Sequence, residues 1–200
     1  MSTEKEITKT QKTDFPIIFF ESQDEWRSWL EQNHNVARGV WLRFYKKGSG
    51  ITSLNYAQAL DEALCYGWID GQSKTSDEKS YLQKFTQRRA RSIWSKRNIE
   101  HIARLTEEGK MKPSGLKAAE AAKADGRWDM AYDSPGNMSI PEDFLLELSK
   151  DKKAYAFFET LNKANTYAIS WRLQTAKKPE TREKRMKIIL GMLSRGEKFH

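Results

Sequence analysis

YAQALDEALCYGWIDGQ, residues 56–72, decides the fold because it joins a helix to a strand within one short stretch. Up to residue 64, small and apolar residues recur at the spacing of a single buried helical face. Gly67 then ends the helix, since glycine readily takes the left-handed conformation found after a last turn. Residues 68–72 have the aromatic and β-branched content of a strand, and Gly71 leaves room for a neighbouring backbone. The stretch therefore predicts a helix packed closely against a sheet.

Working outward, further strands are predicted on both sides of this stretch. Residues 16–20 (PIIFF) form an apolar run typical of a buried strand, and Ser22 with Glu25 forms a capping box that starts a helix ending near residue 34. Residues 39–45 (GVWLRFY) predict a second strand, followed by a glycine turn. Residues 68–72 and 80–86 predict two more strands around a turn at 75–78. The first half thus holds a four-stranded sheet whose strand order the sequence leaves open.

Beyond residue 92 the pattern is helical. Helices are predicted at residues 93–108, 113–124, 154–161, 164–174 and 180–193, and one more starts at a capping box formed by Ser139 and Glu142. The predicted fold class is α+β, in which a small N-terminal β-sheet with one or two helices precedes a helical C-terminal half packed on it. Residues 1–14 are predicted to be a disordered tail, and residues 15–200 a single domain.

The composition narrows the class of protein. Cys65 is the only cysteine, and three scattered histidines form no recognised zinc motif, so neither a structural metal nor a cofactor is predicted. No apolar run approaches the ~20 residues of a transmembrane helix, and the first residues lack a signal core, which predicts a cytoplasmic protein. The net charge of +8 favours an anionic ligand, nucleic acid or another acidic partner. The oligomeric state is left open.

The densest feature is the basic segment, residues 84–98 (KFTQRRARSIWSKRN), with six positive charges and no acidic residue. One interpretation is a binding surface that neutralises phosphates and stacks on bases or sugars. The other is structural, with Trp94 anchoring a helix start in the core and the arginines solvated or paired with acids. The candidate ligand-binding residues are Asp70, Tyr81, Lys84, Arg88, Arg89, Arg91, Trp94, Lys96, Arg97 and Arg182.

Several single residues have both a structural and a functional interpretation. Asp70 either lines a pocket or holds an arginine of the basic segment, and we favour the arginine. Arg182 shares the apolar stripe of the last helix, which favours a structural ion pair over a cleft residue. Cys65 lies at a helix C-terminus, where the macrodipole disfavours a thiolate, so no catalytic role is predicted. Asp61 and Glu62 diverge around their helix and are predicted to be surface charges.

Four motifs together carry a family resemblance: EALCYGWIDG (62–71), FTQRRARSIWSKRN (85–98), RWDMAYDSP (127–135) and TAKKPETR (175–182). With the closing MLSRGEKFH (192–200), they resemble the YdeI/OmpD-associated family, also called bacteriocin-protection proteins. The resemblance implies tolerance of cationic antimicrobial peptides and envelope stress, a porin association, and no established reaction. The family usually has proline where this chain has Gln87 and Ala90, so the basic loop is predicted to be more mobile or differently shaped.

These observations predict a non-enzymatic stress-tolerance protein that binds an anionic ligand, nucleic acid or partner through the basic segment. The alternative is an enzyme that acts on a phosphorylated or carboxylated small molecule. A deep pocket shared by Asp70, Tyr81, Arg88, Trp94 and Arg182 would favour the enzyme, and a flat basic face would favour binding. Because a protein of charge +8 repels cationic peptides at long range, protection is predicted to be indirect.

Overall fold

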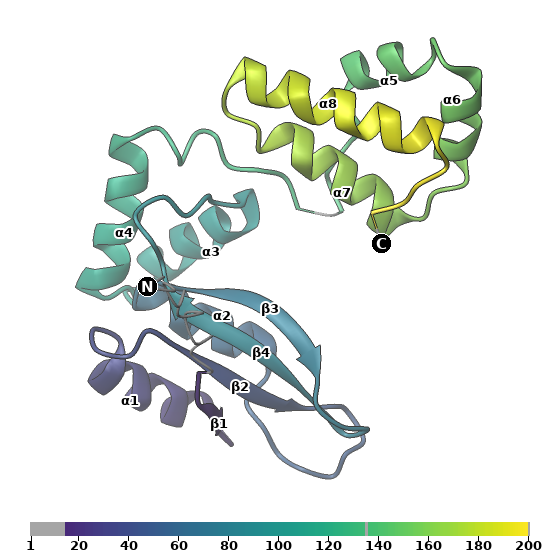
Figure 1. The fold of residues 1–200 in the computed structure, drawn as a ribbon. Helices are drawn as coiled ribbons and strands as arrows, with labels where there is room; N and C mark the ends of the chain where they lie inside the picture. Colours follow the sequence, from purple (N-terminus) through teal and green to yellow (C-terminus); the bar gives the residue numbers. More distant parts are fainter. Residues whose placement is uncertain (1–14, 135, 200) are drawn as a thin grey trace, which may run out of the picture. The chain divides into compact units, whose positions relative to one another are not determined.

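The computed structural model describes residues 15–134 and 136–199 and divides into two compact units (Figure 1). The sheet unit comprises the described residues up to Ser92 together with residues 101–121. The helical unit comprises residues 93–100 and the described residues from 122 onward. The α+β class is confirmed, with a four-stranded sheet followed by helices. The predicted tail, residues 1–14, lies outside the described residues.

The sheet has the order β1-β2-β4-β3, which the sequence did not reveal. Strand β1 (Ile17–Phe19) runs parallel to β2 (Gly39–Tyr45), which pairs antiparallel with β4 (Ser80–Gln87), and β4 pairs antiparallel with β3 (Trp68–Thr75). A register shift between Asp70 and Ser73 interrupts the β3–β4 ladder. The predicted burial of the first strand is wrong, because β1 is an edge strand with Ile17 and Phe19 exposed.

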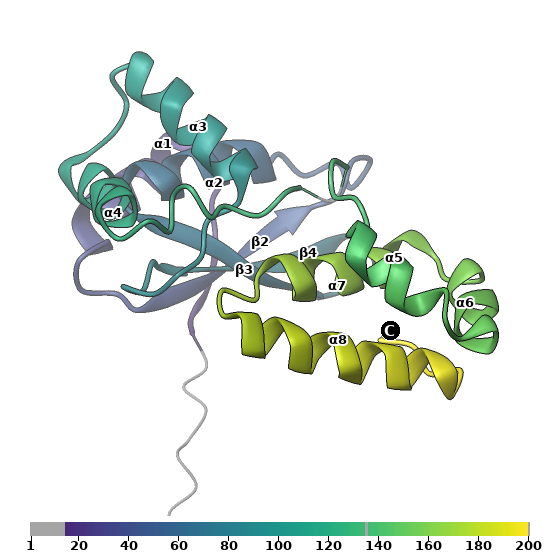
Figure 2. The ribbon, with the colours of Figure 1, turned by 90° about the horizontal axis from the view of Figure 1, so that it is seen from above.

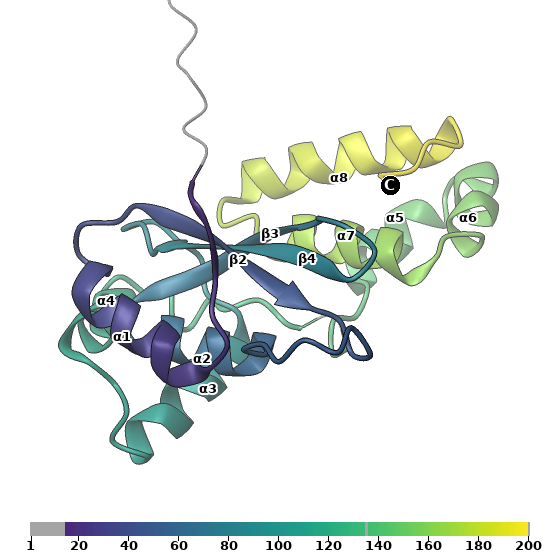
Figure 3. The same ribbon diagram turned by 90° about the horizontal axis from the view of Figure 1, so that it is seen from below.

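Two helices cover one face of this sheet: α1 (Gln23–Asn33) and α2 (Tyr56–Cys65) (Figure 3). Ser22 caps α1 as predicted, because its side chain accepts a hydrogen bond from the Glu25 amide. On α1, Trp26 is fully buried and its ring centroid lies 5.9 Å from that of Phe85 on β4. The face of α2 predicted from its spacing is buried, and this aromatic and aliphatic packing forms the core of the sheet unit.

Helix α3 (Lys96–Glu107) begins within the basic segment, three residues later than predicted, and α4 (Pro113–Ala124) has the predicted bounds. The start of α4 meets the end of α2, where the Lys112 amide donates to the Cys65 carbonyl over 3.1 Å. A Cβ at Gly115 would lie 2.2 Å from that same carbonyl oxygen. Glycine at position 115 is therefore what lets the two helix ends approach so closely.

The helical unit contains α5 (Glu142–Leu148), α6 (Lys152–Glu159), α7 (Lys163–Gln174) and α8 (Pro179–Ser194); Figure 2 shows α7 and α8 side by side. The capping box predicted at Ser139 is wrong, because the N-cap of α5 is Pro141, which has no side-chain cap bond. The core residues of this unit are Phe144, Leu148, Ala154, Ile169, Leu173, Ile189 and Leu193.

Two leucines of α5 provide a matched test of this core. Leu148 is fully buried, whereas Leu146, two positions earlier, is 66% exposed. We expect Leu148→Ala to lower the free energy of unfolding by about 2–5 kcal/mol, because it removes buried apolar surface and leaves a cavity. Leu146→Ala should change it by less than about 0.5 kcal/mol. Urea unfolding of both variants checks the assignment, and similar losses in the two would refute it.

Candidate basic site

The basic segment is held in an ordered turn at the end of β4. The Arg88 amide donates to the Gly67 carbonyl over 3.0 Å. The Arg89 amide donates to the Ser92 hydroxyl over 3.0 Å, and the Ser92 amide returns a bond to the Arg89 carbonyl over 2.9 Å. Reciprocal bonds of this kind fix the backbone of a short turn. The arginines of this turn are therefore presented from a defined backbone.

Gln87 anchors the start of this turn through its side chain. Its Nε2 donates to the carbonyls of His34 and Ala37, at 2.7 Å and 3.0 Å. These bonds tie the end of β4 to the residues that follow α1. Hydrogen bonds from the glutamine side chain thus constrain a position where proline would constrain the backbone through its ring.

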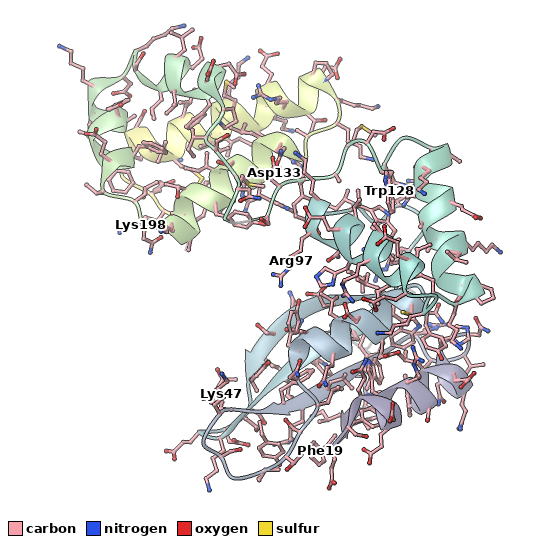
Figure 4. The ribbon with its side chains drawn as sticks, turned by 180° about the vertical axis from the view of Figure 1, so that it is seen from behind. Phe19, Lys47, Arg97, Trp128, Asp133 and Lys198 are labelled. Carbon is pink, nitrogen blue, oxygen red and sulfur yellow. The ribbon has the colours of Figure 1, made fainter. Side chains whose placement is uncertain are left out.

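Three arginines of the basic segment present their charge to solvent. Arg89, Arg91 and Arg97 are exposed, and none forms an ion pair with another described residue. In Figure 4 the Arg97 side chain extends away from the ribbon. Lys96 differs, because its Nζ lies 2.7 Å from a carboxylate oxygen of Asp133. The charge available to a ligand is therefore smaller than the sequence count suggests.

Trp94 is a buried core residue and is not placed to stack on a base or sugar. Its side chain is 1% exposed, and its ring centroid lies 5.1 Å from that of Trp128. The adjacent Ser95 forms a parallel bridge with Tyr132, which fixes the backbone beside it. A buried indole cannot stack on a nucleotide base without leaving its place in the core.

The candidate residues on the sheet have local partners. Asp70 accepts a hydrogen bond from the Tyr56 hydroxyl at 2.7 Å, in place of the arginine that we favoured. Tyr81 stacks on Phe44 with a centroid separation of 5.3 Å. The Nζ of Lys84 lies over the ring of Trp41, 5.8 Å from its centroid. Asp70 lies on the helix-covered face of β3, which explains why it meets a tyrosine of α2.

Arg182 forms the structural ion pair predicted for it, with Asp143 of α5. The hydrogen bond to Asp143 raises the pKa of Arg182, so the guanidinium stays charged. The pair lies on a groove of about 610 Å³ between α5 and α8, with Met186 and Leu190 among its apolar lining. None of the other candidate residues lines this groove.

The prediction of surface charges at Asp61 and Glu62 is wrong for Glu62. Glu62 is 2% exposed and accepts hydrogen bonds from Gln23 at 2.6 Å and from Arg27 at 2.8 Å. Asp61 is half-buried, with one oxygen 2.7 Å from Nδ1 of His101. The sequence did contain a signal for the burial of Glu62. Glu62 lies three positions after Ala59 and therefore shares the helical face of the apolar stripe. A buried carboxylate with two donors is a structural pair between α1 and α2.

The described residues contain no group of three or more side chains placed to hold a metal ion. In the same part of the chain, no helix combines the length and the apolar character that crossing a membrane requires.

Cys65 should be unreactive in the folded protein. The thiol is fully buried, and burial is the main cause that raises its pKa from 9.0 to about 12. A shift of that size lowers the thiolate fraction near pH 8 about a thousandfold, and the thiolate is the reactive form. We expect iodoacetamide to alkylate Cys65 readily in denaturant and hardly at all in the native state, as read by mass spectrometry. A native rate within about tenfold of the unfolded rate would contradict the burial.

The chain matches two family models. Residues 18–118 match a domain of unknown function (DUF8412), which covers the sheet and the start of α4. Residues 137–196 match the model described as "Bacteriocin-protection, YdeI or OmpD-Associated", which covers α5 to α8. Comparisons with curated proteins and with solved structures gave no match.

Proposed function

Since the chain belongs to the bacteriocin-protection, YdeI/OmpD-associated family, we propose that it serves this protective role by binding a polyanion through Arg89 and Arg91. The observation that supports the proposal is that both arginines are exposed, lie in a turn whose backbone is held by hydrogen bonds, and have no acidic partner among the described residues. The family role is a bacteriocin-protection type of function, and polyanion binding is our addition to it.

The chemistry of the guanidinium group suits a phosphate-bearing partner. Arginine presents a rigid fork of donors that matches phosphate oxygens two at a time. Binding releases the counterions condensed on the partner, which supplies most of the affinity at low salt. The turn from Arg89 to Ser92 is already closed by two hydrogen bonds, so its backbone has little conformational entropy left to lose on binding.

The net charge supports an indirect form of protection. At +8 the protein repels a cationic peptide at distances within the screening length of salt. The same charge attracts an anionic partner and speeds the encounter with it. We infer that the partner is anionic and that the peptide is not captured directly.

The double variant Arg89→Gln/Arg91→Gln tests this proposal. We expect weaker binding to a short fluorescent single-stranded DNA, with the slope of log K against log salt flattened by about 1.4, because each lost phosphate contact removes about 0.7. The free energy of unfolding should change by less than about 1 kcal/mol, since neither side chain is in an ion pair. Fluorescence anisotropy across a salt series, with urea unfolding alongside, provides both measurements.

A matched control separates the site from the overall charge. Lys152 and Lys153 are exposed on α6, and Lys152→Gln/Lys153→Gln removes the same two charges. Equal losses of affinity in both double variants would show a net-charge effect only. No measurable binding by the unaltered protein would refute the proposal outright.

A further inference from the structure

A second feature of the sheet unit suits a ligand and is independent of the basic segment. A cavity of about 510 Å³ lies where the end of α1, the end of α2 and the start of α4 come together. It contains several groups able to contact a ligand. They include Glu31, His34, Tyr66, Lys112, Ser114 and Lys117.

Two hydroxyl groups in the wall of this cavity are buried without hydrogen-bond partners. Tyr66 is 3% exposed, and neither its hydroxyl nor that of Ser114 has a partner among the described residues. Buried hydroxyls in folded proteins are almost always bonded to protein, water or a bound group. Burial raises the pKa of Tyr66, with the charge of Glu31 next in effect, so its hydroxyl keeps its proton and remains a donor at neutral pH. Both hydroxyls therefore have a hydrogen bond left to donate to a bound group.

The surroundings of these donors are positively charged. Lys112 and Lys117 form no ion pair within the described part of the chain, and Nζ of Lys112 lies 5.9 Å from the centre of the Tyr66 ring. Lys112 directly precedes α4 and Lys117 lies on its second turn. Helix α4 has 12 residues, and its N-terminal end has a partial positive charge. At this end the amide of Ser114 has no acceptor within its own helix. These are the elements of an anion site.

The wall opposite α4 is rigid, so the cavity is preformed. Nδ1 of His34 lies 2.9 Å from the Leu30 carbonyl, which only accepts, so Nδ1 carries the proton. The carbonyl of His34 itself accepts from Nε1 of Trp68 at 3.0 Å and from Gln87. The imidazole packs beside Tyr66 with a centroid distance of 5.1 Å. A fixed wall lowers the entropy lost when a ligand binds.

We propose that this cavity binds a small anion, a carboxylate or a phosphate monoester, through the hydroxyls of Tyr66 and Ser114, the Ser114 amide and the two lysines. Glu31 also lines the cavity, and its negative charge repels an anion and so lowers the affinity. Removing this charge therefore provides a test. The site lies within the residues matched by the domain of unknown function.

Calorimetric titration of the full chain with inorganic phosphate, and separately with acetate, tests the proposal. We expect saturable binding of at least one anion, and the stronger of the two identifies the tetrahedral or the planar class. Tyr66→Phe and Ser114→Ala should each weaken binding about fivefold or more, the effect of one lost hydrogen bond. Glu31→Gln should strengthen binding, because it removes a like charge from the cavity. An unaltered protein that binds neither anion would overturn the proposal.

Lys123 provides the matched control, since it lies on α4 but outside the lining of this cavity. Lys117→Gln should weaken binding severalfold, whereas Lys123→Gln, with the same loss of charge, should leave it unchanged. Equal weakening in both would overturn the site, as would unchanged affinity in Tyr66→Phe with its fold intact by circular dichroism. The Arg89→Gln/Arg91→Gln variant should retain phosphate binding, which keeps this test separate from that of the proposed polyanion site.

Discussion

The close approach of α2 and α4 at residues 65–67 is the constraint on which the sheet unit depends. The Cys65 carbonyl accepts the Lys112 amide, and Gly67 takes a φ of 74°, a conformation that favours glycine. A Cβ at Gly67 would lie 2.9 Å from the Ser114 carbonyl, so both partners in this junction need glycine. The Gly67 carbonyl then accepts the Arg88 amide. One turn thus ends a helix, starts β3, places α4 and holds the basic segment.

The distribution of charge in this unit separates structural groups from available ones. Glu62 is buried against Arg27, and Asp61 is bonded to His101, so these charges hold helices together. Arg89 and Arg91 have no such partner among the described residues. An exposed, unpaired guanidinium contributes little to the stability of the fold, so it is available to bind a ligand. The sequence shows how many charges there are, but only their partners show which ones are available.

Periodicity predicted the elements well because their apolar faces are local patterns. The β-branched and aromatic content of residues 39–45 and the helical spacing up to residue 64 correspond to β2 and α2. The strand order did not follow, since it depends on which strands pair across long connections. The partner of Asp70 was missed for a similar reason, because Tyr56 approaches it only after the chain has folded back. The cavity at α4 was not predicted at all, since its walls come from three distant stretches of chain.

Gln87 links the two proposed sites through one carbonyl group. Its side chain donates to the carbonyl of His34, whose ring forms a wall of the α4 cavity, and the residue after it begins the turn that presents Arg89. A proline at position 87 would stiffen the same backbone, but it has no donor with which to hold His34. In this chain the end of β4 and the end of α1 are therefore fixed to each other by a side chain. The geometry of the cavity wall and that of the basic turn share this anchor, although their ligand-contacting groups are different.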